Sequence, residues 1–569
     1  MPGRDDLLQL ADDYWDSMLE AFPSAATLLG DRRFDDRIED PSLAAEQRLH
    51  ATWSGLLARV DALADDDFTD GDHITRTLLR GELSHGLDGL GLRMAELASD
   101  QMDGIHADLL TCAPQVNAPS PENARALVER HRQIGGLLDG AVERFREGLT
   151  AGRTPARLVI DRSLNQLDGY LASPLDDDPF VTFAGPDGTD GWDSDAEAAW
   201  RDELRTVARD VIRPAFQRYR DALAAELAPV ARPDDACGLS WLGDDGAALY
   251  AALVRRHTTV TDLDPDKIHQ IGLAEIERLA GEYRDVGSRL FGTSDLAEIF
   301  ARLRDDETLR YTDADEIMAD ANSCLDAARA AMGDWFGRLP VSDCDIMAVP
   351  EFLAADAPAA YYFPPTADGT RPGAYFVNTF EPDRRYRYET ASIAFHEAIP
   401  GHHLQLTIAN ELTELPRFQR FGWSNTAFVE GWALYTERLA DEMGLYRGDM
   451  DRIGMLANDS WRAARLVVDT GLHALGWSRQ QAIDLMVANV PVGRDLIEVE
   501  VDRYVAIPGQ ALGYKVGQLE IQRLRREAEQ AAATTGNGFD IKSFHDTVVG
   551  SGNISLPALR ELLGKEMRS

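Results

Sequence analysis

Three histidines and one glutamate lie within eight residues in the stretch HEAIPGHH, which begins at His396. It opens like the H-E-x-x-H pattern, in which two imidazoles one helical turn apart bind zinc while the glutamate addresses a water molecule. Pro400 stands where the second histidine is expected. Proline cannot donate the helical hydrogen bond and Gly401 tolerates unusual dihedral angles, so a bulge is expected there. Looping out these two residues restores the one-turn spacing and makes His402 the second ligand.

Two alternatives remain open for this stretch. His403 also shares a helix face with His396, because seven residues make two turns, but in an unbroken helix it would lie about 10 Å away. The histidines could instead be solvated or satisfied within a core. Clustering around one glutamate beside a helix break favours a metal site, with zinc as the expected ion.

A catalytic zinc site usually has three protein ligands, and the segment FVEGWALYTERL supplies two acidic candidates. Glu430 is predicted as the third ligand because it lies between apolar and aromatic residues, where an unpaired carboxylate would be costly to bury. Glu437 lies seven residues further on and can share the same helix face. It could support a metal ligand or form a surface ion pair with Arg438.

Candidates further along the chain are less specific. Tyr514 follows a Pro-Gly turn near the start of a helix and could donate a hydrogen bond to a developing oxyanion, or simply pack as a core aromatic. Arg465, Asp469 and His473 are spaced by four and would stack along one helix face. They could support the metal ligands or form a structural polar ladder.

At this point the chain resembles a known family. The strings HEAIPGHHLQ and FVEGWALYTERL, with the blocks DGTRPGAYFVNT and PGQALGYKVG, are similar to the DUF885 family of bacterial proteins. The resemblance extends over most of the chain. It implies a mainly α, large helical zincin-like metallopeptidase fold. The Gly401-His402 pair is also similar to the Gly-His that closes the helix motif of thimet-type and angiotensin-converting-type peptidases, which favours His402.

Two β-rich runs precede the metal stretch, Tyr361–Phe363 and Ala374–Thr379, with the turn pairs Asp368-Gly369 and Pro372-Gly373 between them. They predict a small antiparallel sheet beside the metal helix. Its edge could bind an extended peptide, or the two runs could form an ordinary hairpin.

Most of the remaining chain shows helical periodicity, for example over residues 122–149 and 195–227. The stretch from Pro340 to Pro350 is the best boundary. We therefore expect a helical scaffold region over residues 1–340 and a catalytic region over residues 341–569, the two walling a shared cleft.

Composition excludes several classes of protein. A net charge of -40 repels nucleic acid, and no apolar run is long enough to span a membrane. The N-terminal segment lacks the apolar core of a signal peptide, and the four cysteines form no metal pair, so a cytoplasmic location is expected.

These features together predict a zinc-dependent metallopeptidase that hydrolyses peptide bonds through a metal-activated water. His396, His402 and Glu430 would hold Zn2+, Glu397 would act as general base and Tyr514 as oxyanion donor. Two alternatives remain: a zinc amidohydrolase acting on a small-molecule amide, and a non-catalytic zinc-containing peptide-binding protein. Glu397 argues against the latter, because a structural zinc site needs no base.

Overall fold

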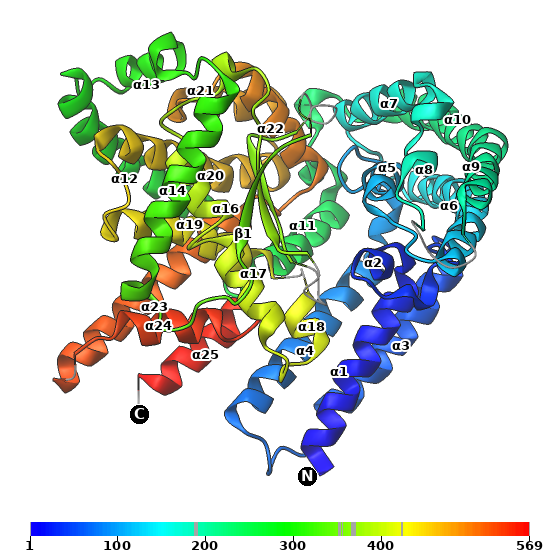
Figure 1. The fold of residues 1–569 in the computed structure, drawn as a ribbon, viewed down its shortest axis with the longest axis horizontal. Helices are drawn as coiled ribbons and strands as arrows, with labels where there is room; N and C mark the ends of the chain where they lie inside the picture. The colour runs from blue at the N-terminus through cyan, green and yellow to red at the C-terminus, as the bar shows by residue number, and fades with distance from the viewer. Residues whose placement is uncertain are drawn as a thin grey trace.

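The chain folds into a mainly α-helical structure with one small sheet, as the sequence predicted (Figure 1). The computed structural model describes residues 2–186, 192–350, 354, 357–365, 371–422, 425–536 and 538–567. Among these residues, none of the helices combines the length and the apolar character that crossing a bilayer would require.

Two of the N-terminal helices pack on helices from later in the chain, because α1 contacts α18 and α4 contacts α11 and α25. The N-terminal helices are α1 (Pro2–Ala21), α2 (Pro23–Leu28), α3 (Leu43–Asp61), α4 (Asp70–Gly91) and α5 (Ile105–Cys112). α4 begins with a capping box, in which the Thr69 hydroxyl accepts from the Asp72 amide while the Asp72 carboxylate accepts from the Thr69 amide.

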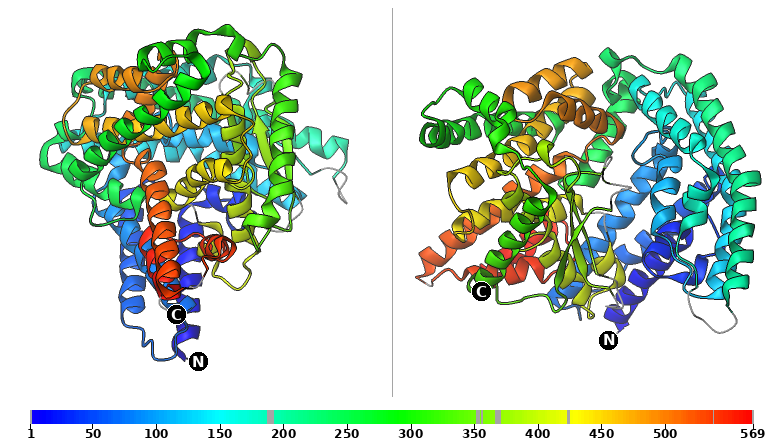
Figure 2. Two further views of the ribbon diagram at one scale, coloured as in Figure 1. Left: turned by 90° about the vertical axis from the view of Figure 1, so that its left-hand side faces the viewer. Right: turned by 45° about the horizontal axis from the view of Figure 1, so that its top comes forward.

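A second group of helices forms its own hydrophobic core and lies at the right of the right-hand view of Figure 2. It comprises α6 (Pro121–Thr150), α7 (Arg157–Ala172), α8 (Pro179–Thr182), α9 (Ser194–Val207) and α10 (Arg213–Ala222). The helix predicted over 122–149 corresponds to α6. The one predicted over 195–227 contains wider π-helical turns at residues 208–212 and 223–227.

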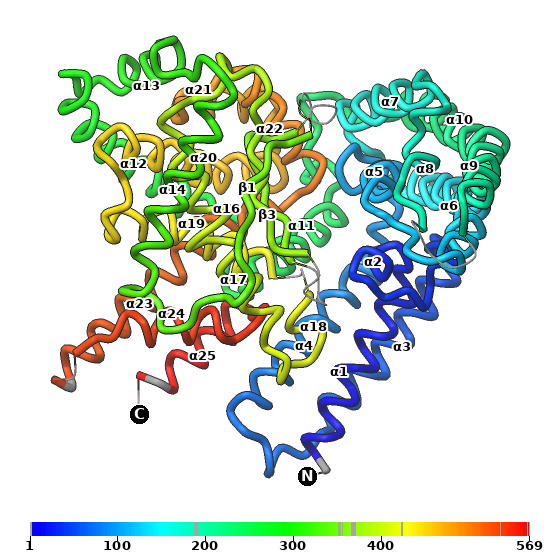
Figure 3. Tube along the Cα trace, in the orientation of Figure 1, coloured from blue at the N-terminus to red at the C-terminus, as the bar shows by residue number. Residues whose placement is uncertain are grey.

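The remaining helices form the body of the molecule, at the left of Figure 3. They are α11 (Gly243–Thr258), α12 (Pro265–Phe291), α13 (Leu296–Asp305), α14 (Ala314–Trp335), α16 (Thr390–Glu397), α17 (His402–Glu411), α18 (Arg417–Phe421), α19 (Thr426–Glu442), α20 (Asp449–His473), α21 (Arg479–Asn489), α22 (Arg494–Ala506), α23 (Leu512–Thr535), α24 (Ile541–Val549) and α25 (Leu556–Glu566). α12 packs along α20 and α14 packs on α16, so the regions before and after residue 340 are in direct contact.

The sheet has the strand order β1-β3-β2, with β1 (Cys344–Ala348), β2 (Ala360–Phe363) and β3 (Gly373–Val377). β2 and β3 form the predicted antiparallel pair, with Tyr362 opposite Tyr375. The prediction of an antiparallel sheet is wrong in one respect, because β1 adds to β3 in parallel and makes the sheet mixed. The predicted turn at Asp368-Gly369 lies outside the described residues.

Candidate metal centre

The helix that carries the histidine stretch breaks where proline and glycine predicted a break. α16 ends at Glu397 and α17 begins at His402. A side chain at position 401 could not be accommodated, since a Cβ on Gly401 would lie 1.9 Å from the His396 carbonyl oxygen. The turn is held from α19, where the Trp432 indole donates to the Pro400 carbonyl oxygen at 3.0 Å.

The break brings three potential ligands to one point. The Nε2 atoms of His396 and His402 lie 3.5 and 3.4 Å from the same Glu430 oxygen, Oε2. Their three ligand atoms all lie within 4.8 Å of one another. Both histidines are buried, and Glu430 is half-buried at the wall of a cavity.

These separations suit a shared metal ion better than direct hydrogen bonds. A charge-assisted N–H···O bond is about 2.7–2.9 Å long. Two ligands of one tetrahedral zinc, each about 2.0–2.1 Å from the ion, lie about 3.3–3.4 Å apart. Two imidazoles and a carboxylate are also a donor set that zinc prefers, so the residues present fit this ion.

The other nitrogen of His396 is held by Glu437. His396 Nδ1 donates to Glu437 Oε1 at 2.8 Å, and the Ser392 hydroxyl donates to Glu437 Oε2 at 2.5 Å. Burial alone would lower the pKa of His396, but the carboxylates of Glu430 and Glu437 outweigh it and raise that pKa to about 9. The pair of carboxylates therefore favours a positive charge at this point, whether on a proton or on a metal ion.

Glu437 is not the surface acid that its neighbour Arg438 suggested as an alternative. Its side chain is 1% exposed. The Arg438 guanidinium instead pairs with Asp459 and Glu282, at 2.6 Å to each. Glu437 thus orients the His396 ring through Nδ1, the nitrogen that does not face Glu430, as carboxylates commonly do for metal-binding histidines.

The three ligand candidates and Glu397 line one cavity of about 350 Å³. Its wall is completed by Tyr361, Tyr362, Leu406, Val429, Arg462, Arg465 and Tyr514. Burial raises the pKa of Glu397, and the charge of Glu430 adds to this, against the opposing effect of His396 and His402. A half-buried carboxylate beside the ligands is suited to accept a proton.

Tyr514 reaches the cavity because α23 packs closely against α19, the helix of Glu430. The helices meet at Gly431 and Gly517, where a Cβ on Gly431 would lie 2.4 Å from the Gly517 Cα. Burial raises the pKa of Tyr514, and the Glu430 charge raises it further, so its hydroxyl remains a donor at neutral pH.

His403 lies outside this cluster. Its Nε2 donates to the Ser342 carbonyl oxygen at 3.1 Å, so its Nδ1 accepts from the Tyr362 hydroxyl at 2.9 Å. Burial lowers the pKa of His403 to about 4, which keeps the ring neutral. Both ring nitrogens of His403 therefore form hydrogen bonds, and the bond with Tyr362 links α17 to β2.

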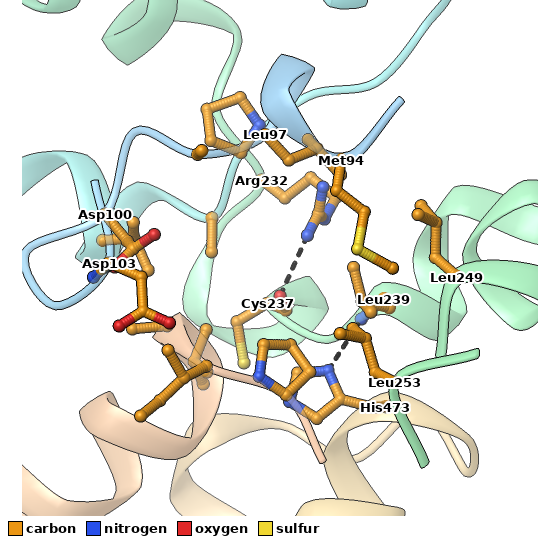
Figure 4. Close-up of a pocket in the computed structure, with 18 of the residues that line it drawn as sticks. Met94, Leu97, Asp100, Asp103, Arg232, Cys237, Leu239, Leu249, Leu253 and His473 are labelled. Atoms are coloured by element: carbon orange, nitrogen blue, oxygen red, sulfur yellow. Dashed lines mark hydrogen bonds between the residues drawn. The ribbon is translucent and has the colours of Figure 1, made fainter. Parts of the chain in front are cut away.

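Asp469 and His473 also point away from the centre. Asp469 accepts from the Tyr250 hydroxyl at 2.6 Å and from the Gly509 amide, and so anchors the turn that precedes α23. His473 lies at a separate cavity of about 180 Å³ (Figure 4), where Nδ1 accepts from the Leu239 amide at 3.1 Å. Its Nε2 donates to the Tyr504 carbonyl oxygen at 2.9 Å.

One of the charged residues that line the cavity was not predicted. Arg462 lies three residues before Arg465, on the same face of α20. The spacing of three indicates that Arg462 shares a helix face with Arg465. Which face of α20 lines the cavity depends on how α20 packs against the other helices, and the sequence spacing does not show this.

Comparison with known proteins identifies relatives without an assigned activity. The family model described as "Bacterial protein of unknown function (DUF885)" matches residues 23–563. No curated protein matches the chain.

Two solved structures share the fold. One, described as "the putative lipoprotein from Colwellia psychrerythraea", has a TM-score of 0.90 and 24% identity, covering 100% of this chain and 99% of that one. The other, "a putative lipoprotein of unknown function from Shewanella oneidensis", has a TM-score of 0.75 and 18% identity, covering 98% and 99%.

Proposed function

This chain belongs to the DUF885 family of bacterial proteins, and we propose that it is a zinc-dependent metallopeptidase with a zincin-like catalytic region. The observation that carries the proposal is the convergence of His396, His402 and Glu430 on one point of a cavity that also contains Glu397. Zinc held by these three residues would lower the pKa of a water molecule toward neutrality.

The chain's own residues supply the proton transfers and the orientation. Glu397 would accept a proton from the attacking water and pass it to the leaving amine. The Tyr514 hydroxyl would donate to the oxyanion that develops on the scissile carbonyl. Glu437 fixes the ring of His396, so that its Nε2 faces Glu430.

A peptide substrate is supported by the strand at the edge of the sheet. Within the described part of the chain β2 is an edge strand that pairs with β3 alone, and Tyr361 and Tyr362 of β2 line the cavity. An extended peptide could add to the free side of β2 through main-chain hydrogen bonds. The cavity of about 350 Å³ is near the lower end of ligand-pocket volumes, which favours a second candidate as well, a zinc amidohydrolase acting on a small amide.

The proposal is tested by digesting an unbiased peptide library with the zinc-loaded protein and with a Glu397→Gln variant, reading products by mass spectrometry. The substitution keeps the shape of the side chain and removes the base, so zinc content should be retained while turnover falls at least about a hundredfold. Equal turnover would exclude Glu397 as the base. Peptide binding without cleavage by the zinc-loaded wild type would favour the non-catalytic binding protein.

A cytoplasmic location also remains a prediction. It is supported by the four cysteines, Cys112, Cys237, Cys324 and Cys344, which are all unpaired. Fractionation of the producing cells would test it, and recovery in the envelope fraction would contradict it.

A further inference from the structure

Two arginines line the cavity of the proposed metal centre. Arg462 and Arg465 lie three residues apart on α20 and line the same cavity as His396, His402, Glu397 and Glu430. Positive charge at this wall has no role in holding a cation, and it requires a separate explanation.

Arg465 is held rigidly and has unused hydrogen-bonding capacity. Its side chain is 7% exposed, and its Nε and Nη2 donate to the Tyr504 hydroxyl and to Glu500, at 3.0 Å each. Its guanidinium lies over the Tyr514 ring, 4.6 Å from the centroid. The remaining nitrogen, Nη1, is buried and has no hydrogen-bond partner among the described residues.

Arg462 forms no ion pair of 4 Å or less within the described part of the chain, although its charge acts to lower the pKa of Glu389 and of Glu397 from a greater distance. Its Nη1 donates to the Asn458 amide oxygen at 2.9 Å, a neutral partner, and its Nε is buried without any. Glu500, the acid beside Arg465, is also shared with Arg503 at 3.3 Å. Arg465 and Arg503 therefore share one carboxylate, and Arg462 pairs with neither Glu500 nor any other described acid within 4 Å.

Buried N–H groups of a charged guanidinium without acceptors are costly, and an anionic ligand would offset that cost. The planar fork of arginine matches a carboxylate, which it binds through paired hydrogen bonds. Glu397 and Glu430, which line the same cavity, would repel a multiply charged anion more strongly than a singly charged one. The observations thus favour one carboxylate rather than a phosphate.

We propose that Arg462 and Arg465 form a carboxylate-binding subsite, so that the substrate is a peptide or amide with a free carboxylate close to the bond that is cleaved. This inference rests on the proposed function for the position of that bond. The carboxylate has two sources, the C-terminus of a short peptide or the side chain of an aspartate or glutamate.

The test compares matched substrates on the wild type and on Arg462→Gln. From one peptide that the wild type cleaves, three versions are made: a free C-terminal acid, its C-terminal amide, and a version in which each acidic side chain near the cleaved bond becomes its amide. The wild type should lose about 10- to 100-fold in kcat/KM on whichever version removes the recognised carboxylate. Arg462→Gln should cleave that version and the original at similar rates.

Controls separate binding from other roles. Arg452→Gln, on the same helix but paired at the surface with Asp441 and Asp449, should keep the wild-type preference. Arg462→Lys should show part of the wild-type preference for the carboxylate, because lysine retains the positive charge but not the planar guanidinium. If Arg462→Gln slows all versions equally, the arginine acts on the oxyanion and the subsite is wrong; the same conclusion follows if the wild type shows no preference.

A binding measurement keeps the two proposals distinguishable. If the zinc-loaded wild type cleaves no peptide, the metallopeptidase proposal fails, and calorimetric titration with short peptide acids and their amides tests the subsite alone. Acids should bind at least about tenfold more tightly than amides, and Arg462→Gln should remove that difference. Equal binding of acids and amides would overturn the subsite.

Discussion

The choice between His402 and His403 depends on how the chain turns at Gly401. His402 Nε2 lies 3.4 Å from Glu430, whereas His403 uses both ring nitrogens in bonds to Tyr362 and Ser342. We predict that His402→Ala abolishes stoichiometric zinc binding, because only two ligands remain. His403→Ala should retain it, with some loss of stability. Zinc content after dialysis measures both, and the opposite pattern would exchange the two histidines.

Glu437 is expected to affect zinc affinity without touching the ion. Its carboxylate orients His396, and removing such a partner typically weakens metal binding about 10- to 100-fold. Glu437→Gln should show a loss of this size in competition with a chelator. The matched control is Glu442→Gln. Glu442 lies on α19, as Glu437 does, and its substitution removes an ion pair with Arg525 of α23. Equal affinities for the two variants would show that Glu437 has no such role.

At the scale of elements, the crossing of α19 and α23 sets the distance between Glu430 and Tyr514. A Cβ on Gly517 would lie 1.7 Å from the Ala427 carbonyl oxygen, so any side chain there must push the helices apart. Gly517→Ala should therefore reduce stability by about 1–3 kcal/mol and also impair turnover. Urea unfolding and the library assay would measure these effects.

Gly169→Ala is the matched control for that substitution. Gly169 lies in α7, and nothing comes within 4 Å of an added Cβ. Alanine favours helices by about 0.5–1 kcal/mol over glycine, so this variant should be slightly more stable. If Gly517→Ala behaved in the same way, the close crossing would not be required.

Local sequence signals predicted much of this arrangement. Periodicity predicted α6 over almost its full length, and Pro400 with Gly401 predicted the break that groups His396 and His402. Both effects depend on residues close in sequence. That these residues hold zinc remains a prediction.

Features that depend on tertiary packing were missed. β1 is five residues long and pairs in parallel with a strand about 30 positions later, so no turn motif indicates it. Asp469 and His473 share a helix face with Arg465, yet they contact α11 and the segment before it rather than the metal centre. The direction of each side chain follows from how α20 packs, which its spacing alone does not determine.

At the scale of the whole molecule, charge is the dominant feature. The chain has 97 acidic and 57 basic residues, an excess of 40 negative charges that repel one another in the folded state. Raising the ionic strength from about 0.01 M to about 1 M shortens the Debye length from about 30 Å to about 3 Å. Repulsion over many residues should be screened more than short contacts such as that of buried Lys515 with Asp459.

We therefore predict that the melting temperature rises with sodium chloride concentration. Differential scanning calorimetry of the metal-free protein would measure it, and sodium chloride is preferred to sulfate because sulfate also strengthens hydrophobic burial. A melting temperature that falls with salt would show that attractive ion pairs outweigh the repulsion.

The proposed metal site is tested most directly by a crystal structure of the zinc-loaded protein with anomalous diffraction measured on both sides of the zinc absorption edge. If His396, His402 and Glu430 hold zinc, one strong zinc peak should lie about 2.0–2.2 Å from His396 Nε2, His402 Nε2 and a Glu430 carboxylate oxygen. A zinc peak bound by other residues, or no peak at this position in crystals grown with zinc, would contradict the proposed site.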